Sequence, residues 1–176
     1  QNLPVVFCMD RGGLSADDGP THHGLFDISY LRPIPNLVHM VPKDEDELAD
    51  MMFTATKQTH PTFIRYPRGL AEGVPIKPQP RLIEIGKAEV VRPFVNNRSH
   101  KIAIFALGNM MRLGASAAEQ LQKDGFDVAL INPQQVHTGN TEGEDVEYIS
   151  LYVDALRVAQ LATELASLAW RTRGDW

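Results

Sequence analysis

The chain has 176 residues, of which 43% are apolar and 22% charged, a composition that suits one or two small globular domains and excludes wholesale disorder. Its net charge of −5 argues against nucleic-acid binding, which depends on a basic surface. The single cysteine, Cys8, excludes a disulfide framework and a cysteine metal site within one chain, and we expect its side chain to be buried as a small apolar group. No apolar run approaches the roughly 20 residues that span a bilayer, so we expect no membrane contact and a cytoplasmic location.

The first part of the chain predicts an α/β fold with a parallel sheet. Residues 3–9 form a continuous apolar run typical of a buried strand, and residues 10–24 then bring charge, glycine and histidine. Two helices and two further strands are predicted in alternation after this loop: 25–31, 37–41, 44–55 and 61–66. This alternation favours right-handed crossovers between parallel strands.

A second α/β segment follows a linker. Prolines and glycines without periodicity predict a semi-rigid linker over residues 70–82. Residues 83–135 predict a mixed sheet and one helix, with strands at 83–91, 102–107 and 126–131 and the helix at 112–123. Residues 136–146 predict a polar loop, and residues 147–171 a long helix that serves either packing or self-association.

Two arginines are the first candidates for binding. Arg11 directly follows the first predicted strand and Arg68 follows the third, each beside a glycine. Because open α/β sheets bind ligands at the carboxyl ends of their strands, we expect the two guanidinium groups to converge there. Paired guanidinium groups hold a phosphate or carboxylate through bidentate hydrogen bonds. For either arginine alone, the alternative is a surface salt bridge.

Asp18, His22 and His23 lie in the loop between the first strand and the first helix. Histidine titrates near neutrality, so it can move protons or hydrogen-bond a substrate. Metal binding is the weaker alternative, because adjacent residues point in different directions and no third ligand is suitably spaced. The remaining histidines are expected to be structural or exposed: His39, His60, His100 and His137.

A hydrolase is a further alternative, because Ser15 lies in the same loop as His22. The sequence has no Gly-x-Ser-x-Gly elbow to support it. It also has no Gly-x-Gly-x-x-Gly dinucleotide motif and no Walker loop.

Several sequence blocks, in order, resemble 1-deoxy-D-xylulose-5-phosphate synthase of the transketolase superfamily. The blocks are DRGG at 10–13, DGPTHHG at 18–24, FDISYLR at 26–32, RYPRG at 65–69 and IGKA at 85–88. The resemblance implies a partial pyrimidine-binding domain in residues 1–69 and a partial transketolase C-terminal domain in residues 83–135. Residues 136–176 would be an unmatched loop and helix, since nothing after about residue 133 matches the family.

The resemblance also implies an activity and its residues. Such synthases condense pyruvate with glyceraldehyde 3-phosphate and depend on thiamine diphosphate and magnesium. The residues matching Arg11 and Arg68 would bind the phosphate of the aldehyde. The residues matching Asp18 and His22 would lie beside the substrate as catalytic residues that assist binding or proton transfer.

The family's diphosphate- and magnesium-binding domain and its cofactor-activating glutamate have no counterpart in this sequence. We therefore expect the isolated chain to be inactive as a synthase, since side chains alone supply no electron sink for decarboxylation. Three hypotheses remain open. The chain is part of a synthase that works with a partner chain, or a non-catalytic assembly module that oligomerises through residues 147–171, or a hydrolase-like enzyme with a residual anion pocket.

Overall fold

The computed structural model describes residues 2–15, 18–95 and 100–136. The helix predicted at 147–171 lies outside the described residues, as do most of the loop predicted before it and His137. The chain divides into two units, Gln1–Val146 and Glu147–Trp176, and all features below belong to the first. In the described part of the chain, no helix is long and apolar enough to cross a membrane.

The first sheet has the strand order β1-β3-β2-β7. Its strands are β1 (Val6–Met9), β3 (Thr62–Arg65), β2 (Val38–Met40) and β7 (Gln135–Val136). β3 pairs in parallel with β1 and with β2, which confirms the predicted parallel sheet. β7 pairs antiparallel with β2, so the prediction that a loop begins at residue 136 is wrong at this position. The pairing is favourable because it satisfies backbone groups of β2 and buries the side chain of Val136.

β1 lies at the edge of this sheet, and β3 is its one neighbour among the strands described. The prediction that residues 3–9 form a buried strand is therefore wrong, since Phe7 remains 49% exposed. Cys8 is also exposed, contrary to expectation, although its sulfur lies 3.6 Å from that of Met52. An edge strand is covered from one side only, so apolar composition alone does not bury it.

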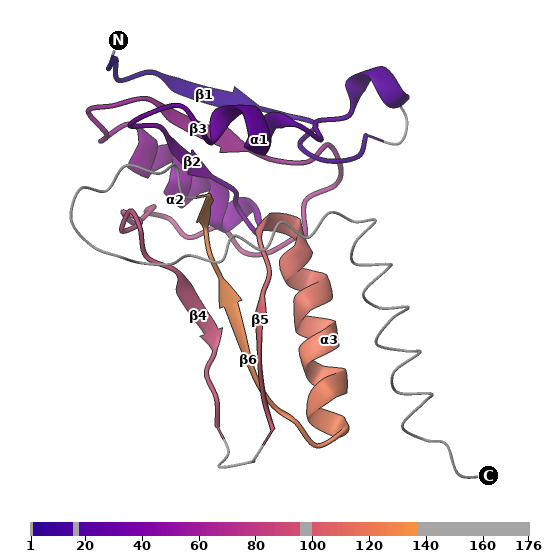
Figure 1. Cartoon of the computed structure of the whole chain (residues 1–176). Coiled ribbons are helices and arrows are strands. Elements are labelled where there is room, and N and C mark those ends of the chain that lie inside the picture. The colour runs from indigo at the N-terminus through magenta and orange to yellow at the C-terminus, as the bar shows by residue number, and fades with distance from the viewer. Residues whose placement is uncertain (1, 16–17, 96–99, 137–176) are drawn as a thin grey trace. The chain divides into compact units, whose positions relative to one another are not determined.

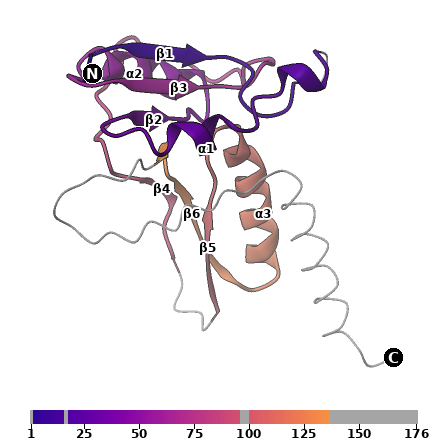
Figure 2. The same ribbon diagram turned by 45° about the horizontal axis from the view of Figure 1, so that its top comes forward.

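Two helices cover opposite faces of the first sheet (Figures 1 and 2). α2 (Glu45–Ala55) packs on one face, with a core of Val38, Met40, Met51, Ala55, Ile64 and Ile83. Because side chains alternate along a strand, His39, Phe63 and Arg65 point to the other face. The short helix α1 (Asp27–Leu31) lies there, and its Asp27 pairs with Arg65.

α2 begins where the sequence predicts a cap. The Asp44 carboxylate accepts a hydrogen bond from the backbone N–H of Glu47 at 2.8 Å. The first turn is acidic at positions 45, 46 and 47, which complements the partial positive charge of a helix N-terminus.

One face of α2 also holds the linker. Asp46, Asp50 and Thr54 recur at a spacing of four, so their side-chain oxygens share that face. They accept hydrogen bonds from backbone N–H groups of the linker and of the residue that follows it: Lys77 at 2.8 Å, Arg81 at 2.8 Å and Ile83 at 2.9 Å, respectively. The linker is thus fastened to α2 along its length, and this explains how a proline-containing segment without secondary structure is ordered.

The second sheet has the order β4-β6-β5 and is mixed, as predicted. Its strands are β4 (Glu89–Arg92), β5 (Lys101–Phe105) and β6 (Asp127–Asn132), with β6 antiparallel to β4 and parallel to β5. The strand predicted at 83–91 starts only at Glu89, because Gly86 adopts a turn conformation with φ of +85°.

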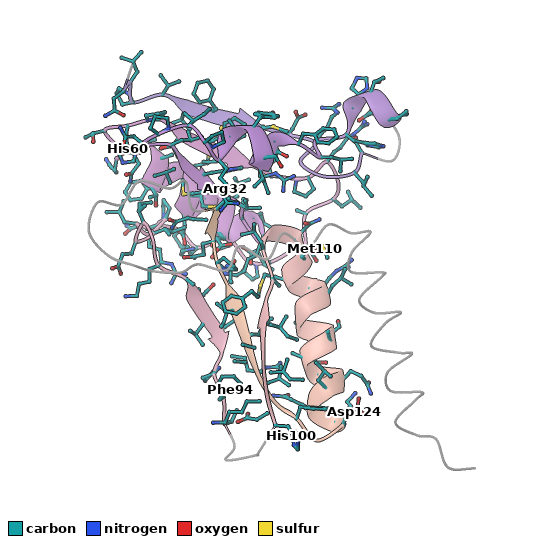
Figure 3. All side chains as sticks on the ribbon, in the orientation of Figure 1. Arg32, His60, Phe94, His100, Met110 and Asp124 are labelled. Atoms are coloured by element: carbon teal, nitrogen blue, oxygen red, sulfur yellow. The ribbon has the colours of Figure 1, made fainter. Side chains whose placement is uncertain are left out.

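α3 (Met111–Lys123) follows the short 3₁₀ turn η2 (Gly108–Met110) and packs on the second sheet. Met110 and Asp124 lie at its two ends (Figure 3). The close packing depends on Gly114, where a Cβ atom would lie 2.8 Å from that of Ala106. A small residue at this position lets the helix backbone approach the sheet.

Candidate functional site

Two parallel strand ends place Arg11 and Arg68 at one edge of the first sheet. β1 and β3 are paired in register to their last residues, so the segments that follow them leave the sheet together. The backbone N–H of Gly12 donates to the carbonyl oxygen of Tyr66 at 2.9 Å, which ties the two segments to each other. The edge is the carboxyl edge of the parallel strands, where open α/β sheets bind their ligands.

The loop that begins at Asp10 is closed by contacts between glycines at its base. Gly13 and Gly24 exchange two backbone hydrogen bonds, both of 2.9 Å, and Gly24 also donates to the carbonyl of Arg11 at 3.1 Å. A Cβ atom at position 24 would lie 2.5 Å from that carbonyl oxygen, so the closure requires glycine. Arg11 itself has φ of +58°, a left-handed conformation that costs a non-glycine residue roughly 1–2 kcal/mol and is frequent at functional sites.

The carboxylate of Asp18 joins the two arginines. Its Oδ2 accepts hydrogen bonds from Arg11 Nε at 2.8 Å and from Ser15 Oγ at 2.7 Å. Its Oδ1 accepts a hydrogen bond from the guanidinium group of Arg68, and Arg11 also contacts Asp10. Hydrogen bonds from Arg68, Ser15 and Arg11 hold the pKa of the Asp18 carboxyl far below its usual range, so the group is ionised at neutral pH.

The two loop histidines have different surroundings. His22 lies exposed on the 3₁₀ turn η1 (Pro20–His22), with its Nδ1 3.0 Å from the hydroxyl oxygen of Thr21. His23 is half-buried, and its Nδ1 accepts a hydrogen bond from the backbone N–H of Ser15 at 2.9 Å. An accepting Nδ1 places the proton of a neutral His23 ring on Nε2. His23 therefore supports the loop, whereas the ring of His22 is accessible to a ligand.

The structure adds a supporting ion pair that the sequence analysis missed. Arg65 donates to the carboxylate of Asp27, which is 1% exposed, and its NH2 group donates to the carbonyl of Gly24 at 3.1 Å. This pair links the end of β3 to the closed base of the loop and to α1. Arg65 lies within a predicted strand and Asp27 near the start of a predicted helix, but nothing in the sequence around either residue indicates that the two side chains pair.

The other histidines and potential metal ligands lie elsewhere. His39 is fully buried in β2 and His100 is exposed, whereas His60 lies beside the start of β3, away from the loop at 10–24 (Figure 3). Within residues 2–15, 18–95 and 100–136, no group of three or more His, Cys, Asp or Glu side chains is arranged to hold a metal ion. The described residues therefore do not fit the magnesium ion that the resemblance implies.

The family of the transketolase pyrimidine-binding domain matches residues 1–73. Residues 1–73 belong to this transketolase family. The pyrimidine-binding segment thus contains both arginines, Asp18 and His22, and the resemblance predicted from the sequence is confirmed.

Relatives extend the similarity beyond residues 1–73. The chain is 57% identical over 136 residues to the 1-deoxy-D-xylulose-5-phosphate synthase of Methylacidiphilum infernorum, covering 77% of this chain and 21% of the relative. It is 57% identical over 142 residues to the synthase of Acidobacterium capsulatum, covering 81% of this chain and 22% of the relative. The chain therefore spans about a fifth of the length of these curated relatives.

A solved structure supports the transketolase fold. It is described as a split gene transketolase, inactive beta4 tetramer, and it matches with a TM-score of 0.62 at 25% sequence identity. The match covers 77% of this chain and 41% of that chain.

Proposed function

We propose that this chain supplies the part of a 1-deoxy-D-xylulose-5-phosphate synthase that binds the phosphate of glyceraldehyde 3-phosphate. The observation that carries the proposal is the meeting of Arg11 and Arg68 on one carboxylate, at the carboxyl edge of two parallel strands. The 57% identity to synthases supports the assignment of this edge to that reaction.

The chemistry of the edge suits a phosphate ester. A phosphate group carries close to two negative charges at neutral pH and accepts several hydrogen bonds. The guanidinium groups of Arg11 and Arg68 offer donors from two directions, and a hydrogen bond to a charged group contributes about 1.5–3 kcal/mol. With the phosphate held there, Asp18 and the accessible ring of His22 would serve the aldehyde end as groups that bind a hydroxyl or transfer a proton.

Thiamine diphosphate, which the family resemblance implies together with magnesium, would supply the electron sink for decarboxylation of pyruvate. The described residues hold no group of three or more His, Cys, Asp or Glu side chains arranged for the metal, so we assign binding of the cofactor to a domain outside them. That domain would belong to a longer polypeptide or to a partner chain, in an oligomeric cytoplasmic enzyme.

Substitution of either arginine should weaken binding of glyceraldehyde 3-phosphate. We expect Arg11→Gln and Arg68→Gln each to raise the dissociation constant about tenfold or more, because each removes a charge-assisted donor from the phosphate. Isothermal titration calorimetry measures this directly. Arg112→Gln is the matched control, since it removes one positive charge from an exposed position on α3. Equal affinities for the three variants and the unsubstituted chain would refute the phosphate-binding role.

Synthase activity should require the cofactor-binding domain. With pyruvate, glyceraldehyde 3-phosphate, thiamine diphosphate and magnesium, we expect turnover only after a chain carrying that domain is added, and none from this chain alone. The measurement is formation of 1-deoxy-D-xylulose 5-phosphate during a titration of one chain with the other. Rapid turnover by the unmixed chain would contradict the proposal.

A further inference from the structure

The anion-binding arginines already have an anionic partner within the chain. Asp18 accepts from Arg11 through one carboxylate oxygen and from Arg68 through the other. Extending the proposed function, on which this inference rests, we propose that Asp18 is an internal competitor for the phosphate site. Its carboxylate uses the guanidinium donors that a phosphate ester would need, so the ester binds only as Asp18 withdraws from them.

The same donors suit both acceptors. Arginine binds carboxylates and phosphates alike through N–H donors that lie in the plane of its guanidinium group, so both anions can use the same donors. Two negative groups at one pair of arginines also repel each other, which opposes simultaneous binding. Phosphate presents more acceptor oxygens and a larger charge than a carboxylate. A ligand phosphate can therefore take over the donors, at a cost set by the contacts that Asp18 gives up.

The exposure of the groups permits this exchange. The side chain of Arg68 is 45% exposed, that of Arg11 34% and that of Asp18 19%, so solvent and ligand reach the cluster. Ser15 is 2% exposed, and its hydroxyl group donates a hydrogen bond of 2.7 Å to the carboxylate of Asp18. Ser15 thus gives Asp18 a donor that does not depend on the arginines.

Removal of Asp18 should strengthen anion binding. We expect Asp18→Ala to bind inorganic phosphate about tenfold more tightly than the unsubstituted chain, measured by isothermal titration calorimetry. Asp18→Asn should show a smaller gain, because its amide oxygen still accepts from one guanidinium group. Thermal unfolding of both variants checks that each substitution leaves the fold intact. A gain in phosphate affinity in both variants shows that the effect does not come from a local distortion in one of them.

Asp10→Ala is the matched control. It removes one negative charge next to Arg11 but leaves the contact that joins both arginines, so its gain should be at most about threefold. Equal gains in phosphate affinity for Asp10→Ala and Asp18→Ala would show that the gain comes from the loss of a negative charge alone, and would overturn competition by Asp18. Unchanged phosphate affinity in Asp18→Ala, with measurable binding in both chains, would overturn competition while leaving the arginine site intact. Absence of binding in every chain would instead overturn the proposed function.

Discussion

Replacing Glu47 by alanine should destabilise the fold by about 3–5 kcal/mol, the range found when one partner of a buried charged network is removed. Glu47 is 2% exposed and accepts hydrogen bonds from several groups at once. Its Oε2 accepts from the backbone N–H of Lys43 at 2.7 Å. Its Oε1 accepts from the side-chain amides of Asn132 at 2.8 Å and Gln134 at 2.7 Å.

This network joins helix α2 of the first sheet to the end of β6 in the second. Loss of the carboxylate would remove the acceptor of the Gln134 amide and of the Lys43 backbone N–H, and it would leave the Asn132 amide only its 3.3 Å hydrogen bond to Glu89. Unsatisfied buried donors cost about 1–3 kcal/mol each. Glu47→Gln keeps the size of the side chain but replaces one accepting oxygen by an NH₂ group, which cannot accept a hydrogen bond from the neighbouring donors. We therefore expect a smaller but clear loss of stability.

Urea unfolding followed by circular dichroism measures both variants. Glu84→Ala is the control, because Glu84 forms a surface ion pair with Lys87 at 2.9 Å and its side chain is 71% exposed. Such pairs contribute at most about 1 kcal/mol. If Glu47→Ala proves no more costly than Glu84→Ala, the network does not stabilise the junction between the two sheets.

The stability of the protein should fall by about 2 kcal/mol between pH 7.5 and pH 5 because of His39. Its ring is 0% exposed, and neither ring nitrogen has a hydrogen-bond partner. Its neighbours include the ring of Phe63, edge-on at 5.3 Å between centroids, and the positive charge of Arg65. Burial of the ring is the main cause that lowers the pKa of His39 to about 3, and the positive charge of Arg65 is the second cause.

The sign of the effect follows from proton binding. Between pH 3 and the unfolded value of about 6.5, the unfolded chain binds a proton at His39 that the folded chain excludes. Acid therefore favours unfolding in this window, and the full stability returns as the pH rises above 6.5. Keeping the measurement at or above pH 5 limits the contribution of carboxyl groups, which titrate near pH 4 in unfolded chains.

His39→Leu tests the assignment, since leucine fills a similar volume and does not titrate. We expect the difference in the free energy of unfolding between pH 7.5 and pH 5 to be mostly absent in His39→Leu. His100→Gln, at an exposed position, should retain this difference. Chemical unfolding at each pH gives the comparison. A pH dependence in His39→Leu as steep as that of the unsubstituted chain would exclude His39 as its source.

Local sequence signals predicted most of the elements. The spacing of apolar residues and the cap at Asp44 placed α2, and the apolar runs placed the three parallel strands of the first sheet. The strand predicted at 83–91 was too long, because the turn at Gly86 depends on a single residue whose conformation the apolar pattern does not reveal.

The candidate site was only partly visible in the sequence. Arg11 and Arg68 could be placed at one edge, because parallel strands end on the same side of a sheet. That both would meet Asp18 could not be predicted, since the loop path depends on glycine contacts that close it. The support from Asp27 and Arg65 joins residues 38 positions apart, a distance over which local patterns carry no information.

The sequence by itself determined the α/β class, the parallel orientation of the first strands and the family, because periodicity, the alternation of strands with helices and sequence blocks are local properties. Only the tertiary structure decided that β1 lies exposed at an edge, that β7 returns to the first sheet, and which residues surround the arginines. These features depend on which surfaces meet when the chain packs. Burial and hydrogen bonding between distant residues are settled by that packing, and an apolar or charged residue in isolation does not specify its neighbours.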